Sequence, residues 1–230
     1  MRINKKLTIF FDIGNVFVYP DGETIANVLS KIEGLVINPL KAENAFLLAD
    51  KDLYLSSNDK NSNQSFVELW GIYTNIDSTL INKAWRYLGD ETQHRYWNKV
   101  DQYSSSLLLS IKNMGFKVGA ISNTDGKLVE DLREFNLLEF FDVIIDSKIE
   151  GIEKPDVRLY KLAAQRLSVD ISESIYVGDT IPELDGALES GMKDVILYDP
   201  LNIYSEVSKY KKANSLKDLE EMLTLQEITL

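Results

Sequence analysis

From Tyr103 to Tyr198 the chain alternates between amphipathic segments and short apolar runs. The apolar runs have the length of buried strands and span residues 116–121, 142–146, 174–178 and 194–198. The segments beside and between them carry apolar residues at helical spacing, over about residues 107–115, 126–135, 156–167 and 183–190. This alternation predicts the α/β fold class, with a Rossmann-like parallel sheet core and helices on both of its faces.

A fifth predicted strand, Leu7 to Phe11, lies far in sequence from these sheet partners. Between them, from about Gly22 to Asn98, apolar residues recur at helical spacing and no convincing strand is visible. We therefore predict an α/β core domain formed by residues 1–18 and 101–230, interrupted by a helical-bundle cap domain at 19–100. An amphipathic segment from Ser215 predicts a closing helix.

Three polar residues stand where predicted strands end. Asp12 follows the first strand, Ser122 follows the second, and Asp179 follows the run that ends at Gly178. Because the carboxyl ends of parallel strands form the crevice in which open α/β sheets bind ligands, we expect these side chains to lie close together. Lys154 is expected to reach the same edge from a neighbouring loop.

These four sites, in this order, resemble the motifs of the haloacid dehalogenase-like (HAD) hydrolase superfamily, and the resemblance covers nearly the whole chain. It implies a helical insert of the C1 cap type after the first motif. The string Phe11-Asp12-Ile13-Gly14-Asn15-Val16 is similar to the Asp-x-Gly-Asn-Val variant of the first motif in sugar-1-phosphate phosphatase-like members. The resemblance therefore implies a hydrolase, and a phosphatase as its first candidate.

The implied catalytic residues are Asp12 and Lys154. A carboxylate at Asp12 can attack phosphorus and form an aspartyl-phosphate, which splits one difficult step into two. Lys154 would bind the substrate and neutralise the developing phosphoryl charge. Ser122 and Asn123 would bind the substrate through the hydroxyl and nearby amides, although helix capping is an alternative role for both.

A metal ion is also implied, because a carboxylate that attacks a phosphate dianion needs a hard cation to hold the two together. The expected cofactor is Mg²⁺, bound by Asp12, the backbone carbonyl of Gly14, Asp179 and Glu183. The spacing favours Glu183 over Asp185 as the last of these acids. The alternative for Glu183 is an acid at a helix N-terminus, which the helix dipole favours.

Gly14 departs from the best-known phosphatases of the superfamily, which have a second Asp there to protonate the leaving oxygen. General acid–base catalysis contributes about 10²-fold to 10⁴-fold, and Asn15 is no substitute as a proton donor. Three functions stay open: a Mg²⁺-dependent phosphatase, a 2-haloacid dehalogenase, and a catalytically silent phosphate-binding or regulatory protein. Halide leaves without a proton, and Ser122-Asn123 resembles the dehalogenase branch.

Composition limits the partners. With a formal net charge of −11 the chain repels nucleic acids and anionic membranes, so we expect neither as a partner and expect a small phosphorylated metabolite instead.

The absence of cysteine excludes thiolate metal sites and fits a cytoplasmic protein. The first apolar run is too short for a signal peptide. A single histidine, His94, leaves no material for histidine metal clusters. We expect a monomer or a homodimer.

Overall fold

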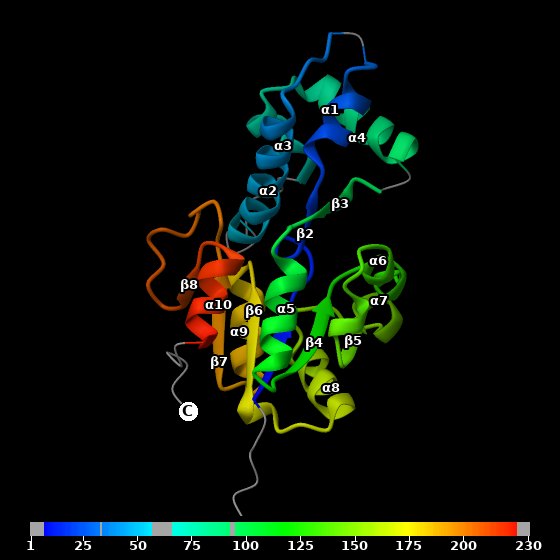
Figure 1. The fold of residues 1–230 in the computed structure, drawn as a ribbon. Coiled ribbons are helices and arrows are strands. Elements are labelled where there is room, and N and C mark those ends of the chain that lie inside the picture. The colour runs from blue at the N-terminus through cyan, green and yellow to red at the C-terminus, as the bar shows by residue number, and fades with distance from the viewer. Residues whose placement is uncertain (1–6, 33, 57–65, 93–94, 225–230) are drawn as a thin grey trace, which may run out of the picture. The chain divides into compact units, whose positions relative to one another are not determined.

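The computed structural model describes residues 7–32, 34–56, 66–92 and 95–224. His94 therefore lies outside the described residues. The chain divides into two compact units, which are coloured by residue number in Figure 1. The helical unit comprises Val18–Lys99, and the α/β unit comprises the chain up to Phe17 and from Val100 onward. Among the described helices, none combines the length and the apolar composition needed to cross a membrane.

The α/β unit is built on a six-stranded sheet in the order β5-β4-β1-β6-β7-β8. Every neighbouring pair is parallel. The strands are β1 (Thr8–Phe11), β4 (Lys117–Ser122), β5 (Val143–Asp146), β6 (Ser174–Gly178), β7 (Asp194–Tyr198) and β8 (Lys211–Ala213). The α/β fold class and the five predicted strands are confirmed. Strand β8 was not predicted, because it is three residues long and two of them are lysines.

Helices cover both faces of this sheet. Helix α5 packs against β4 and α10, whereas α8 packs against β4 and β5, and α9 against β6 and β7 (Figure 1). Phe10 and Tyr176 point into the core under α8 and α9, and their neighbours Ile9 and Ile175, on the opposite face, are fully buried as well. The helices of this unit are α5 (Ser104–Asn113), α6 (Leu128–Glu134), α7 (Ser147–Glu150), α8 (Val157–Leu167), α9 (Ile181–Glu189) and α10 (Leu216–Thr224), and the short 3-10 helices are η1 (Leu138–Phe140) and η2 (Ile171–Glu173).

The helical unit contains α1 (Gly22–Leu29), α2 (Pro39–Ser56), α3 (Phe66–Thr74) and α4 (Ser78–Thr92). Strands β2 (Val18–Pro20) and β3 (Trp97–Val100) pair as a two-stranded sheet where the chain enters and leaves it. The expectation that no strand lies between Gly22 and Asn98 is therefore wrong at its end, because β3 is only four residues long and lacks an apolar run.

Aromatic packing stabilises the core of the helical unit. The ring of Phe46 lies 5.7 Å from that of Trp70, 6.0 Å from that of Trp85 and 6.1 Å from that of Trp97, between ring centroids. Trp70 is fully buried. The three tryptophans of the chain thus share one aromatic partner, and core packing accounts for their positions.

Candidate active site

Strand pairing brings the three strand-end residues to one edge of the sheet. Strand β1 lies between β4 and β6, with Phe11 opposite both Ala120 and Val177. The pairing with β6 continues for one residue beyond β1, because the Asp12 backbone N–H donates to the Val177 carbonyl at 2.9 Å. Asp12 and Asp179 therefore follow β1 and β6, and Ser122 ends the adjacent β4, all at the same end of the sheet, as the sequence predicts.

The carboxylate of Asp12 is buried and held through both of its oxygens. The Ser122 hydroxyl and the Ile13 backbone N–H donate to its Oδ1, at 2.9 and 2.7 Å. Its Oδ2 forms an ion pair with the Lys154 ammonium at 2.7 Å. Ser122 thus contacts Asp12 directly, and the side chain predicted to be the nucleophile has one fixed orientation.

The backbone of Lys154 is fixed by Asn123. The Lys154 N–H donates to the Asn123 side-chain oxygen at 2.9 Å, and the Asn123 side-chain N–H₂ donates to the Lys154 carbonyl at 3.1 Å. Helix α9 also comes close to this loop, because Gly186 has no side chain: a Cβ atom there would lie 2.3 Å from the Pro155 carbonyl oxygen. The Asn123 side chain is therefore engaged in placing Lys154, a contact that its predicted substrate-binding role did not anticipate.

The Lys154 ammonium is almost completely buried and has three acceptors. Besides Asp12 Oδ2, these are Glu183 Oε2 at 3.1 Å and the Tyr176 hydroxyl at 3.1 Å. Burial lowers the pKa of Lys154, but the charges of Asp12 and Glu183 outweigh it and raise that pKa above its ordinary value. Lys154 is therefore a fixed positive charge beside Asp12.

Asp12, Asp179 and Glu183 form a buried acidic cluster, in which one carboxylate oxygen from each lies within 4.8 Å of the others. Burial raises the pKa of Glu183 to about 8; the charge of Lys154 opposes this rise, and the charges of Asp12 and Asp179 add to it. Two of these three carboxyl groups, those of Asp12 and Glu183, pair with the Lys154 ammonium group. A donor set of hard oxygens with excess negative charge fits a divalent cation such as Mg²⁺.

Two residues of the metal-site prediction remain, namely Gly14 and the alternative acid Asp185. Gly14 lies two residues beyond Asp12, directly before the turn at residues 15–17. Asp185 accepts hydrogen bonds from Lys209 Nζ and the Tyr210 hydroxyl, at 2.5 and 2.6 Å. Its carboxylate therefore anchors the loop before β8, and Glu183 is the acid that lies beside Asp12.

Tyr176 is a site residue that the sequence did not reveal. It lies within an apolar run that forms a buried strand, where a tyrosine is expected to pack in the hydrophobic core. Its hydroxyl accepts from Lys154 and donates to Glu183 Oε2 at 3.2 Å. Burial, together with the negative charges of Glu183 and Asp12, raises the pKa of Tyr176 well above its ordinary value. The spacing of Tyr176 and Gly178 is the only sequence signal, since both residues lie on one face of β6.

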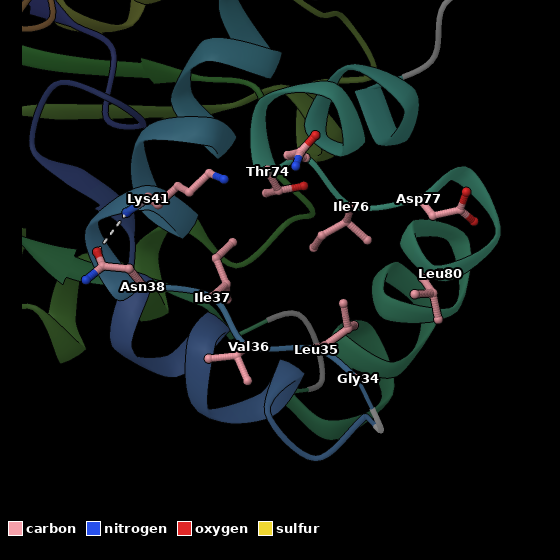
Figure 2. A pocket seen from close by; sticks show the side chains of 11 residues that line it. Gly34, Leu35, Val36, Ile37, Asn38, Lys41, Thr74, Ile76, Asp77 and Leu80 are labelled. Carbon is pink, nitrogen blue, oxygen red and sulfur yellow. Dashed lines mark hydrogen bonds between the residues drawn. The ribbon is translucent and has the colours of Figure 1, made fainter.

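A cavity of about 290 Å³ lies within the helical unit (Figure 2). Its apolar wall includes Leu35, Ile37, Ile76 and Leu80, and the Lys41 side chain extends along its rim. None of the residues of the acidic cluster lines it. The acidic cluster therefore belongs to the α/β unit, whereas this cavity belongs to the helical unit.

Comparison with known protein families identifies the family of this chain. A family model described as haloacid dehalogenase-like hydrolase matches residues 36–197, well over half of the chain. The chain belongs to the haloacid dehalogenase-like hydrolase family. The superfamily predicted from the four motifs is confirmed, while the C1 cap type and the sugar-1-phosphate phosphatase variant remain predictions.

One relative is a glyceraldehyde 3-phosphate phosphatase of Methanopyrus kandleri, which is 37% identical over 90 residues, or 38% of this chain and 39% of the relative. The chain spans between 38% and 56% of the length of the relatives that share this name.

Solved structures show the same fold over nearly all of the chain. YfnB of Bacillus subtilis, solved bound to magnesium, has a TM-score of 0.64 and 16% identity, with 96% of this chain and 99% of that one covered. The L-2-haloacid dehalogenase of Xanthobacter autotrophicus has a TM-score of 0.63 and 14% identity, with 95% and 98% covered. At these identities the likeness concerns the fold alone.

Proposed function

We propose that this chain is a Mg²⁺-dependent phosphatase that hydrolyses a small phosphorylated metabolite through an aspartyl-phosphate on Asp12. One observation carries the proposal: a buried carboxylate, fixed by Ser122 and Lys154, lies within 4.8 Å of two further acids. A nucleophile, a positive charge and a cation-binding set are the parts that transfer of a phosphoryl group to a carboxylate requires.

In the first step an oxygen of Asp12 attacks phosphorus. An O–P bond to Asp12 forms as the bond between phosphorus and the leaving oxygen breaks, and the leaving oxygen takes both electrons of that bond. Lys154 stabilises the negative charge on the phosphoryl oxygens, and the Ser122 hydroxyl can turn from Asp12 to one of them. When bound by Asp12, the Gly14 carbonyl, Asp179 and Glu183, Mg²⁺ supplies positive charge that reduces the repulsion between carboxylate and phosphate.

In the second step water attacks the phosphorus of the aspartyl-phosphate. The O–P bond to Asp12 breaks, inorganic phosphate forms, and Asp12 is again a carboxylate. Gly14 provides no side chain that can protonate the leaving group or deprotonate this water. The lack of a general acid at this position favours substrates whose leaving oxygen is only weakly basic.

The substrate class follows from the relatives and from the charge. Relatives that share part of the chain are named glyceraldehyde 3-phosphate phosphatase, after a small phosphate ester. The net charge of −11 disfavours nucleic acids, which carry many phosphates, more strongly than a small metabolite with one. We propose a small phosphorylated metabolite without naming it.

Phosphate release from a panel of sugar phosphates, nucleotides and acyl phosphates tests the proposal. We expect turnover with Mg²⁺, its loss with chelator, and its loss in the Asp12→Asn variant. Asp185→Asn is the matched control, since that carboxylate binds Lys209 and Tyr210 and should leave turnover unchanged. Turnover that survives the chelator or Asp12→Asn would contradict the proposal.

Two alternatives are distinguished by the same preparation. A 2-haloacid dehalogenase would release halide from short haloacids whether or not a chelator is present. A silent binding protein would bind a phosphate analogue such as orthovanadate but release no phosphate from any substrate. The buried acidic cluster supports the phosphatase over the dehalogenase, because its carboxylate oxygens suit a divalent cation and dehalogenation does not use a metal ion.

A further inference from the structure

The Tyr176 hydroxyl links the two charged groups that flank Asp12. It accepts a hydrogen bond from the Lys154 ammonium at 3.1 Å and donates one to Glu183 Oε2 at 3.2 Å. Tyr176 is fully buried, and so is the head group of Lys154. With Asp12 and Glu183, Tyr176 completes three acceptors for the three ammonium N–H groups, so that the lysine head group is held at three points.

The strand is shaped to place this hydroxyl. Residues 176 and 178 lie on the same face of β6, and the Tyr176 ring runs over Gly178 toward the carboxyl end of the strand. A Cβ atom on Gly178 would lie 2.6 Å from Tyr176 Cε1 and 3.2 Å from its hydroxyl oxygen. No other residue than glycine leaves room for the ring. Glycine at position 178 therefore leaves the space that the Tyr176 ring occupies.

A second tyrosine supports the ring without touching Lys154. Tyr160 on α8 packs edge-on against Tyr176, with ring centroids 5.3 Å apart and an interplanar angle of 87°. Its hydroxyl donates to the backbone carbonyl of Glu183 at 2.9 Å. Tyr160 and Tyr176 are both fully buried and both end in a hydrogen-bonded hydroxyl, but only that of Tyr176 contacts the ammonium group.

We infer that Tyr176 is a positioning residue, whose hydroxyl aims the Lys154 ammonium at the phosphoryl group on Asp12 and keeps Glu183 facing the same point. The inference rests on the proposed function. Of the three acceptors of Lys154, Tyr176 is the neutral one, so its contact orients the ammonium group without neutralising the charge that faces the phosphoryl group. Pre-orientation of this kind acts in the transition state, where the charge develops, more than in substrate binding.

The test compares Tyr176→Phe with Tyr160→Phe. Each variant removes one buried hydroxyl, so we expect similar losses of unfolding free energy in urea. With Mg²⁺ and para-nitrophenyl phosphate, Tyr176→Phe should lower kcat about 10-fold to 100-fold with KM within about threefold of the wild type, because a hydrogen bond to a charged group is lost. Tyr160→Phe should keep kcat within about threefold. Equal kcat values for the two variants, or a rise in KM that accounts for the whole loss, would overturn the inference.

A second measurement does not depend on turnover. In protein labelled with ¹⁵N-lysine, the Lys154 ammonium signal, identified by its absence in Lys154→Met, should be protected from exchange in the wild type and in Tyr160→Phe. Loss of that protection in Tyr176→Phe supports the inference even if no phosphate ester is hydrolysed, in which case only the proposed function fails. Unchanged protection in Tyr176→Phe refutes the inference even if the enzyme is active.

Discussion

Replacing Glu183 with Gln should change how the stability of the metal-free protein depends on pH. Burial, against the opposing charge of Lys154 and with the added charges of Asp12 and Asp179, raises the pKa of Glu183 from 4.5 to about 8. In the unfolded chain the same carboxyl titrates near its ordinary value. Over the range between the two values the folded state holds a proton that the unfolded state has lost.

The sign follows from this difference. A carboxyl whose pKa is higher in the folded state contributes its full stability below the unfolded pKa and loses it as the pH rises toward the folded pKa. For a shift from 4.5 to about 8, linkage predicts a loss of about 3 kcal/mol between about pH 5 and pH 8. Glu183→Gln resembles the protonated form at every pH, so this loss should be absent.

The assay is urea unfolding of both proteins across this pH range in the presence of EDTA. We expect the wild type and Glu183→Gln to be similar near pH 5 and the variant to be more stable by about 3 kcal/mol near pH 8. Glu189→Gln, on the exposed last turn of α9, is the matched control and should follow the wild type. Added Mg²⁺ should flatten the wild-type curve, since a cation stabilises ionised Glu183. Parallel curves for the wild type and Glu183→Gln would refute the reasoning.

Three further substitutions test the charges and contacts of the site. Lys154→Met removes the positive charge that pairs with Asp12 and Glu183, so the free energy of unfolding in EDTA should fall by about 3–5 kcal/mol. Added Mg²⁺ should restore it, and a loss that Mg²⁺ does not relieve would contradict this. Gly178→Ala forces the Tyr176 ring to move, so it should lower the free energy of urea unfolding by about 1–3 kcal/mol. It should also lower phosphatase activity, and unaltered activity would show that the ring position is not needed. Gly14→Asp should raise turnover of alkyl phosphates more than that of aryl phosphates, because only the former need a proton; equal effects on both would remove this explanation.

Much of the α/β unit could be predicted because its buried strands are continuous apolar runs. Strands β6 and β7 lie at the predicted residues, and β1, β4 and β5 differ only at their ends. Parallel strands covered on both faces have this composition, which few other segments share. Strand β8 has no such run, and its pairing with β7 is decided by the sheet edge it meets.

The site could be predicted only in part, and the reason is the range of its contacts. Asp12, Ser122 and Asp179 are found from sequence because each directly follows or ends a strand. The contact of Asn123 with Lys154 spans 31 positions, and that of Lys154 with Tyr176 spans 22. No local pattern encodes such pairs, since they depend on how the loop after α7 meets the sheet. These are the contacts that decide where the lysine charge points.

The buried charges of the acidic cluster are weak evidence that the cluster stabilises the fold. Buried ion pairs seldom stabilise a fold more than well-packed apolar residues of similar size, because desolvation cancels most of the Coulomb attraction. Here Asp12 and Glu183 share the ammonium group of Lys154, and burial, together with the charges of Asp12 and Asp179, raises the pKa of Glu183 despite the opposing charge of Lys154. In the proposed function, a bound cation would supply further positive charge beside these carboxyl groups. Because Lys154 is held by Asn123, Glu183 and Tyr176 rather than by Asp12 alone, a cation and a phosphoryl group can share Asp12 without releasing the lysine.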